Sequence, residues 1–462
     1  MNRFQFIIIL SCLIGPLPAA ADTQESGTLS PAAPQASEMF AGSPEVIMSL
    51  DDCISTALSQ SPTIRIADLE LTRYDYSRKE TLAALLPKID FALSYQRSIE
   101  LQTMRMDMGG QSQQIKMGSD NTWNTGFTAS LPLVAPTLWK SLSLSSTQIL
   151  QAAESARTSR LQTVNAVSQA YYSLMLALAS RDVIRQNYET ALLNAQLYEK
   201  RFSQGTASEY DVLRANVQVT NLEPDLLQAE IAINRCKLQL CVLLGLDVNV
   251  NITPDTTLEA METLMRPASG ETYPLDANPS LRSLDLQRRL AADNTSLRKM
   301  AFLPTLGASF NINWLALSND SPFKNQQFSP YSSVGLQLQV PIFSGGSRWY
   351  ALKQAKVQQT ELDLQREDLV NSLRMQVDIA VEDIDRQARQ VVSSRRGVDQ
   401  ARKARSIMQK SFEIGAATYL ELRDSEVAEM SARLVYLQAI HSWLSASSEL
   451  DLLLGREHPA IK

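Results

Sequence analysis

The chain has 462 residues, with 43 basic and 49 acidic side chains and a formal net charge of −6 at pH 7. This acidic balance, with no basic cluster, argues against a nucleic-acid partner, because such partners are held mainly by neutralising phosphates. The four cysteines are scattered without a Cys-x-x-Cys pair, and the two histidines, His441 and His458, lie far from any set with ligand spacing. The composition therefore argues against a disulfide framework and against a zinc or acid/base site.

The N-terminus has the pattern of an export signal. Arg3 precedes an apolar run and three alanines that end at Ala21, which predicts a cleavable signal peptide over residues 1–21. Lipidation of Cys12 is an alternative, disfavoured because the residues after it stay apolar. Residues 22–46 are rich in Ser, Ala, Pro, Gln and Gly and predict a flexible leader. Beyond the signal, no segment has the roughly 18 apolar residues of a helical membrane span, so a membrane role would require strands.

The sequence is internally duplicated. Ser61-Pro62 recurs 217 residues later as Asn278-Pro279, and Leu243-Leu244-Gly245 recurs 210 residues later as Leu453-Leu454-Gly455. A shared registry of this kind predicts two structural copies in one chain. Each copy opens with a shorter helix, and the boundaries we expect are a first repeat at 47–246, an inter-repeat linker at 247–274, a second repeat at 275–456 and a tail at 457–462.

Each repeat contains a very long segment with few helix breakers. Residues 137–204 have no Pro or Gly, and the matching residues 347–414 are interrupted only by Gly397. At 1.5 Å per residue each helix would be about 100 Å long. A second helix candidate follows Gly205 to residue 244 and Gly415 to residue 454. We therefore predict two long helical hairpins, 137–244 and 347–454, which turn at glycines and pack against other helices through apolar stripes.

The remaining segments alternate apolar and polar residues with period two, which predicts β-hairpins at about 88–134 and 305–343. Four strands of about ten residues match a tilted membrane crossing, with the apolar face towards lipid and the nearly uncharged polar face towards water. Four strands cannot close a barrel, and open edges cannot remain in lipid, so several protomers must share one barrel. The loops 98–121 and 315–330 would lie beyond the membrane. Interfacial aromatic residues are expected at strand ends: Tyr95, Trp123, Trp314 and Tyr331.

Three segments carry a resemblance to a known family. The passage from the last strand to a helix, Pro341 to Arg348, reads PIFSGGSR; the two turns read RFSQGTASEYDVL, from Arg201, and FEIGAATYLEL, from Phe412. With the repeated order of helix, β-hairpin and helical hairpin, they resemble the outer-membrane efflux protein family, the TolC-like export ducts. The first repeat keeps the proline of the passage but lacks its paired glycines. The passage residues are therefore Pro132, Pro341, Gly345 and Gly346.

The resemblance implies a mainly α fold with β: a homotrimer with a 12-stranded transmembrane β-barrel in the outer membrane of a Gram-negative bacterium, continued by an α-barrel across the periplasm. It also implies a passive duct for efflux or type I secretion, without cofactor or enzymatic activity. A periplasmic adaptor protein and an inner-membrane pump would be its partners. The pump rather than the duct would select the cargo, which the sequence does not name. The adaptor would dock on the helix tips, at Arg201, Gly205, Ser208, Gly415 and Thr418.

The resemblance further implies a periplasmic gate at the tips. Asp211 matches the acidic residue of the first tip, and Glu421 and Asp424 match acids that line the constriction. Three copies of the last two would place six carboxylates at the aperture, where they would repel one another and favour cations. The usual tyrosine and arginine partners are replaced by Phe412 and Ala417. Arg214 is a candidate substitute.

Simpler interpretations also account for the acids and glycines of the tips. Acids near a turn commonly stabilise helix N-termini, and turn glycines commonly serve geometry alone. A methionine-rich segment, with Met104, Met106, Met108 and Met117, has soft thioether ligands for Cu(I), although a tolerant outer loop explains it more simply. The alternative to a membrane duct is a secreted helical coiled-coil scaffold, in which the apolar strand faces would be buried. A duct requires those faces to be exposed.

Overall fold

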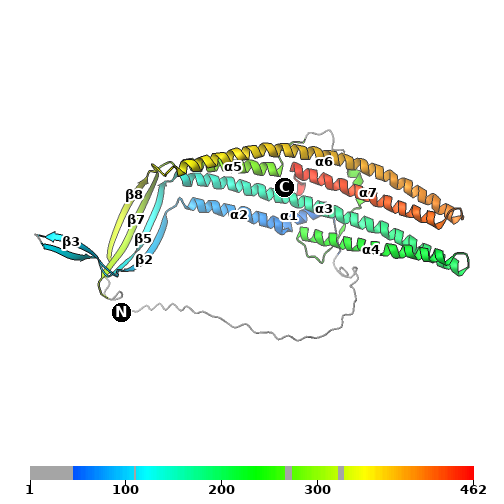
Figure 1. Ribbon diagram of the computed structural model, residues 1–462, viewed down its shortest axis with the longest axis horizontal. Helices are drawn as coiled ribbons and strands as arrows, with labels where there is room; N and C mark the ends of the chain where they lie inside the picture. The colour runs from blue at the N-terminus through cyan, green and yellow to red at the C-terminus, as the bar shows by residue number, and fades with distance from the viewer. Residues whose placement is uncertain (1–44, 109–110, 266–272, 321–326, 462) are drawn as a thin grey trace, which may run out of the picture. The chain divides into compact units, whose positions relative to one another are not determined.

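The computed structural model describes residues 45–108, 111–265, 273–320 and 327–461 (Figure 1). The predicted signal peptide, its alternative lipidation site Cys12 and the leader as far as residue 44 lie outside the described residues. The last two residues assigned to the leader, Glu45 and Val46, begin a strand, β1 (Glu45–Met48). That strand pairs in parallel with β6 (Asn251–Pro254), so part of the segment predicted as an inter-repeat linker is ordered structure.

The chain is mainly helical. The two long hairpins are α3–α4 and α6–α7, and the long helices α3 and α6 contain 68 and 67 residues. The second helix of each hairpin begins three residues later than predicted, because a turn and a capping residue occupy those positions. The helices are α1 (Leu50–Gln60), α2 (Pro62–Ala83), α3 (Pro136–Ser203), α4 (Glu209–Leu244), α5 (Pro279–Met300), α6 (Ser347–Glu413) and α7 (Tyr419–Leu454).

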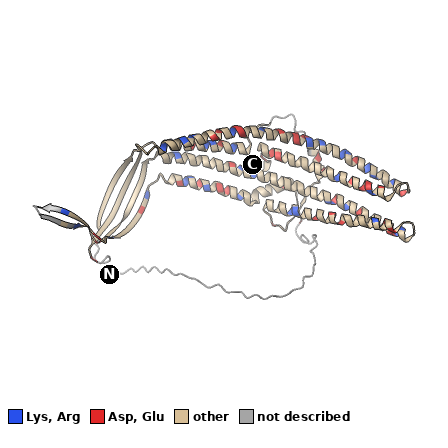
Figure 2. Cartoon of the chain, in the orientation of Figure 1, with Lys and Arg blue, Asp and Glu red and all other residues tan. Residues whose placement is uncertain are grey.

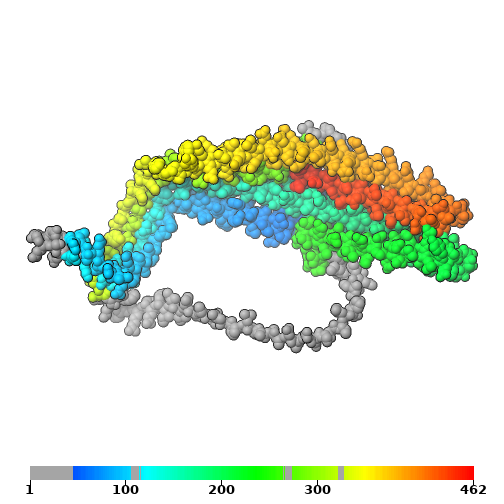
Figure 3. All heavy atoms as spheres, viewed as in Figure 1, coloured from blue at the N-terminus to red at the C-terminus, as the bar shows by residue number. Residues whose placement is uncertain are grey.

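Helix α3 is the central packing element. It contacts its hairpin partner α4, the short helices α2 and α5 of both repeats, and α7 of the second hairpin. Helix α6 lies against α5 and α7, as Figures 1 and 3 show. The main apolar cluster draws on both repeats and includes Tyr171, Leu174, Leu240 and Ile440, none of which is more than 1% exposed. The predicted stripe on α3 therefore buries itself against neighbouring helices.

The repeated Leu-Leu-Gly and Ser/Asn-Pro motifs meet in space. Gly245 and Gly455 end α4 and α7 with φ of 71° and 65°. A Cβ on Gly455 would lie 2.0 Å from the carbonyl oxygen of Ala277, and one on Gly245 would lie 2.8 Å from that of Gln60. The glycines are thus required both by left-handed backbone and by a close approach to the residue that precedes each Ser/Asn-Pro motif.

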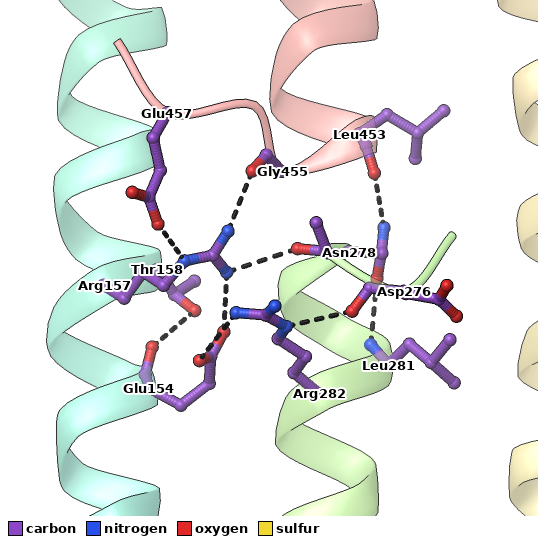
Figure 4. Close-up of polar contacts among 11 residues, drawn as sticks. Glu154, Arg157, Thr158, Asp276, Asn278, Leu281, Arg282, Leu453, Gly455 and Glu457 are labelled. Carbon is purple, nitrogen blue, oxygen red and sulfur yellow. Dashed lines mark hydrogen bonds and ion pairs between the residues drawn. The ribbon is translucent and has the colours of Figure 1, made fainter. Parts of the chain in front are cut away.

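In the second repeat a partly buried arginine holds this junction (Figure 4). Arg157 of α3 donates to the carbonyl oxygens of Gly455 (2.8 Å) and Ala277 (3.2 Å) and pairs with Glu457 (2.6 Å). Asn278 caps α5 and donates to the last turn of α7, at Leu453. The helix ends therefore have partners for the carbonyls that the helices leave unsatisfied.

Four strands form an antiparallel sheet in the order β2-β5-β7-β8. They are β2 (Lys88–Arg97), β5 (Asn121–Val134), β7 (Thr305–Ser318) and β8 (Ser329–Gln339). Residues 98–121, predicted as a loop, instead contain a separate antiparallel hairpin of β3 (Gln102–Met108) and β4 (Gln111–Met117). Methionine alternates with polar residues there, and this period-two pattern is that of a strand. Two short 3-10 helices, η1 (Leu258–Leu264) and η2 (Pro459–Ile461), lie in the predicted linker and tail.

Candidate functional site: a two-faced sheet and two helix tips

One face of the sheet is mainly apolar on all four strands and is exposed. The pairing aligns Ile89 with Ala129, Phe310 and Val334 in one cross-strand row. The next row aligns Phe91 with Phe127 and Ile312 and ends at Ser332 of β8. Ile89 is 70% exposed and Val334 is 78% exposed. A soluble protein rarely exposes a contiguous apolar surface of this extent. Exposure is the outcome that separates a membrane duct from a scaffold with a buried sheet.

The opposite face is polar and almost uncharged. Its rows align Asp90 with Thr128, Asn311 and Ser333, and a Cβ on Gly126 of the adjoining row would lie 2.1 Å from the side chain of Asn313. Figure 2 shows charged residues spread along the helices and nearly absent from β5, β7 and β8. Among the described strands, β2 and β8 each pair on one side only, so the sheet has two open edges.

Three of the four predicted interfacial aromatic residues share the apolar face. Tyr95 lies opposite Trp123, with ring centroids 4.6 Å apart, and Trp314 lies 6.5 Å from Phe127 on the same face. Tyr331 pairs with Asn313 and so lies on the polar face. The sequence prediction considered only that Tyr331 lies near a strand end. Its face is set by the alternation of side chains along β8: Tyr331 lies an odd number of residues from Val334 and therefore on the opposite face.

The two passages from strand to helix differ in backbone. Gly345 and Gly346 have φ of 62° and 82°, and Arg348 donates to the carbonyl oxygen of Pro341 at 3.1 Å. In the first repeat the pairing shifts between Pro132 and Val134, and Ala135 enters α3 with a negative φ of −136°. The paired glycines are present where two successive left-handed residues are needed and absent where the turn is made without them.

The two helix tips have the same backbone. The amide of Gly205 donates to Phe202 and that of Thr206 to Arg201, and Gly415 and Ala416 make the equivalent bonds in the second tip. Both glycines are left-handed, with φ of 71° and 75°, and a Cβ on either would meet no atom within 4 Å. Backbone conformation rather than space therefore requires glycine at both turns.

Two of the predicted gate acids cap helices in the protomer. The Asp211 carboxylate accepts from the hydroxyl and amide of Ser208, at 2.6 and 3.2 Å, and the Glu421 carboxylate accepts from both groups of Thr418 at 2.8 Å. Each hydroxyl accepts in return from the amide three residues on, which completes a capping box. The hydrogen bonds from the Thr418 backbone and side chain lower the pKa of Glu421.

The structure does not bring Arg214 to Asp424 within the described protomer. The Asp424 carboxylate instead accepts from Arg423, its neighbour in sequence, at 2.9 Å. Asp424 is exposed at the surface of the described protomer. The residues predicted to dock an adaptor lie in or beside the two turns: Arg201, Gly205, Ser208, Gly415 and Thr418.

An aromatic cluster that the sequence analysis did not identify joins the two tips. Tyr198 of α3 packs on Tyr419 of α7, with ring centroids 4.9 Å apart, and both lie about 6.5 Å from Phe412 of α6. The guanidinium of Arg201 lies 5.8 Å from the Tyr198 centroid and 5.6 Å from the Phe412 centroid. Phe412 and Tyr419 flank Gly415 at both sides of the turn, which is the signal that could have revealed the cluster.

A polar seam, buried at Glu429 and exposed at Gln186, lies farther along the same helices. Glu429 of α7 is 7% exposed and pairs with Arg405 of α6 at 3.1 Å. Arg433 of α7 donates to Gln186 of α3 at 2.5 Å, which links the second hairpin to the first. Burial raises the pKa of Glu426, although the nearby Arg405 opposes the shift. The two hairpins are thus joined by aromatic contacts at the tips and by polar contacts in this seam.

None of the described helices combines the length and apolarity needed to cross a membrane. Within the described ranges, no group of three or more His, Cys, Asp and Glu residues is arranged to hold a metal ion.

The outer membrane efflux protein family matches this chain over residues 53–246 and 274–456, one segment for each repeat. The chain belongs to that family. It is therefore an outer-membrane channel component for efflux or secretion, located in the outer membrane of a Gram-negative bacterium, and its family is one of channels rather than enzymes.

Curated relatives and solved structures agree with this membership. The chain is 25% identical to the alkaline protease secretion protein AprF of Pseudomonas aeruginosa, over 67% of this chain and 64% of AprF, so the match spans slightly less than two thirds of that relative. It is 24% identical to the outer membrane protein TolC of Vibrio cholerae, over 74% of this chain and 76% of TolC. The crystal structure of the Campylobacter jejuni CmeC outer membrane channel has the same fold, with a TM-score of 0.69 at 14% identity, covering 88% of this chain and 85% of CmeC.

Proposed function

We propose that three copies of this chain form one passive export duct, in which the four-stranded sheets close a 12-stranded transmembrane β-barrel. The observation that carries the proposal is the two-faced sheet. Its apolar face is exposed and its polar face is nearly uncharged, as a wall between lipid and water requires. A scaffold that buries its sheet would not leave Val334 78% exposed.

The open edges explain why the duct needs more than one chain. The edge strands β2 and β8 offer unpaired backbone groups, which cannot remain unsatisfied in lipid. Antiparallel pairing of β2 of one copy with β8 of the next satisfies them and closes the sheet. The long hairpins then lie side by side and enclose an α-helical tube that continues the channel through the periplasm.

The periplasmic end of the duct is the gate and the docking site. The tips project Arg201, Ser208 and Thr418 towards an adaptor protein that an inner-membrane pump supplies with cargo. Around the axis, Asp424 contributes one carboxylate per copy, and Glu421 and Asp211 contribute capping carboxylates beside it. Arg214, which has no contact with Asp424 inside the described protomer, is positioned to meet an acid of a neighbouring copy. The duct performs no bond chemistry and binds no cofactor, and the pump supplies both energy and choice of cargo.

The experiment is to purify the full chain with and without detergent, measure its mass and record conductance in planar bilayers. The proposal requires a trimer that is stable only in detergent and that inserts as a pore of low resting conductance. A detergent-free monomer that inserts no pore would contradict it. Export is then measured in cells that contain the adaptor and the pump. The compounds whose export is lost when the chain is deleted identify the cargo class.

A further inference from the structure

A closed gate at the tips of the proposed duct requires the two tips of each protomer to stay together, and in this chain the tip carboxylates have partners within their own hairpin. Asp211 and Glu421 are both occupied by the capping hydroxyl and amide of their own turn. Asp424 is paired with the adjacent Arg423. Among the described residues, the contacts that join the two tips are instead apolar and centre on aromatic rings.

We propose that Tyr198, Phe412, Tyr419 and Arg201 form an aromatic clamp that holds the channel closed, with Arg201 as the residue that positions the rings. The inference rests on the proposed gate at the helix tips. Tyr198 and Tyr419 are each 7% exposed and come from different hairpins, so their contact is a buried interface between the two repeats. Separation of the hairpins would expose both rings to water.

The position of Arg201 fits a clamp better than a surface charge. Its guanidinium lies within 6 Å of one ring from each hairpin, Tyr198 of the first and Phe412 of the second. A cation at this distance from a ring centroid is attracted by the electron-rich face of the ring, and partial burial strengthens the attraction. Arg201 therefore bridges the hairpins, and no carboxylate in the described part of the chain pairs with it.

The pseudo-symmetry of the chain supplies an internal comparison. Phe202 stands in the first tip where Phe412 stands in the second, three residues before the turn glycine. Phe202 is 48% exposed and belongs to no described aromatic contact, whereas Phe412 packs against the cluster of Tyr198 and Tyr419. Only one member of the pair can act in the clamp, so the other is a matched control.

The clamp predicts a gate that responds weakly to salt. An ion-pair latch at an exposed tip would weaken as ionic strength rises, because the screening length falls from about 10 Å at 0.1 M to about 3 Å at 1 M. Ring packing depends on the removal of apolar surface from water, which salt does not screen. The contacts of Arg201 with the rings are short and partly buried, so salt screens them much less than an exposed ion pair. The ratio of open to closed time should therefore change by less than about twofold across this range.

The test uses the reconstituted full-length trimer, with single-channel recordings at both salt concentrations. Phe412→Ala and Arg201→Met should each raise the ratio of open to closed time by roughly tenfold, since either change removes ring contacts in all three copies. The conservative variants Phe412→Tyr and Arg201→Lys keep a ring or a cation and should stay within about twofold of the unaltered protein. Phe202→Ala should leave the ratio unchanged. Should Phe412→Ala fail to assemble, Phe412→Leu keeps apolar volume without the ring.

The outcomes separate the clamp from the duct. Trimers that form pores but remain closed in Phe412→Ala or Phe412→Leu and in Arg201→Met would overturn the clamp and leave the proposed function standing. Equal opening by Phe202→Ala would also overturn it, because general loosening of the tips would then explain the effect. An unaltered protein that forms no pore would instead remove the proposed function, on which the clamp rests.

Discussion

The two helix tips share a backbone and differ in their side chains. Each turns at a left-handed glycine, with a hydroxyl three residues later and a carboxylate three residues after that: Gly205, Ser208 and Asp211 in one, Gly415, Thr418 and Glu421 in the other. Of the clamp residues, only Phe412 has the same residue type at its equivalent position, Phe202. The other three do not repeat: Met408 is the counterpart of Tyr198, Ser411 of Arg201 and Glu209 of Tyr419. The duplication thus preserves turn geometry, while the contacts between the tips depend mainly on residues that differ between the two copies.

The largest effect is expected at the turn glycines, and the shared backbone of the two tips predicts an equal effect in each. Gly205→Val and Gly415→Val should each destabilise their own tip by about 2 kcal/mol, because a β-branched residue resists the left-handed region. Hydrogen exchange of the tip amides measures the loss. Gly415→Asn, which tolerates that region better, is the control. Adaptor-dependent export should fall more than trimer assembly, and an equal fall of both would assign the glycine to folding alone.

The capping hydroxyls should give the next largest effect, again equal in the two tips. Ser208→Ala and Thr418→Ala each remove the acceptor for a helix N-terminal amide and should cost about 1 kcal/mol. Amide exchange in the first turns of α4 and α7 reports the change. Ser203→Ala is a matched control, since that exposed hydroxyl only donates back to its own helix at Lys200. A control variant as damaging as the caps would refute the assignment.

Acid should weaken the second tip through Glu421. Its pKa is lowered in the folded tip, so its stabilising effect is complete above the ordinary value for Glu, about 4.3, and is lost as pH falls below that value through the lowered pKa. Amide exchange in the first turn of α7 should accelerate in that window. In Thr418→Val, which removes the donor hydroxyl, the acceleration should shrink. An unchanged acid response would show that the capping bond is not its source.

Glu426, on the same helix, should respond in the opposite sense. Burial raises its pKa, so its contribution to stability is greatest below the ordinary value for Glu and is lost as pH rises through the raised pKa. The contacts between α3 and α7 should therefore tighten as pH falls from neutral. Glu426→Gln should abolish that change while leaving the response of Glu421 intact. Exchange rates along α3 near Asn194 provide the measurement.

The smallest effect is expected at Asp424. The first tip has no matching acid, because Arg214 occupies the equivalent position. Asp424→Ala should reduce cation preference in planar bilayers by about twofold, with trimers intact, because each copy loses one carboxylate near the axis. Glu209→Ala removes an exposed acid of the first tip and should leave selectivity unchanged. Unaltered selectivity in Asp424→Ala would place this carboxylate away from the constriction.

Backbone features were readable from the sequence because they depend on local patterns. Turn glycines, capping residues and alternating strands each have a short-range signal, and the structure places α3, α6 and the four strands within a few residues of expectation. Long-range contacts were not readable. Whether Arg201 meets Phe412, more than 200 residues away, depends on how α3 and α6 are placed by the whole helical packing. The face of Tyr331 was recoverable from its alternation with Val334, and the β3–β4 hairpin from the alternation of its methionines.

The apolar face of the sheet is the claim on which the duct rests, and it can be tested residue by residue. Spin labels are placed singly at Ser333 and Val334, adjacent residues that face opposite sides of β8, in a Cys236→Ser background that leaves Cys53 and Cys241 buried. In reconstituted bilayers, the label at 334 should collide with oxygen dissolved in lipid and the label at 333 with a water-soluble nickel complex. Equal accessibility at both positions, or shielding of 334 from lipid, would contradict the account.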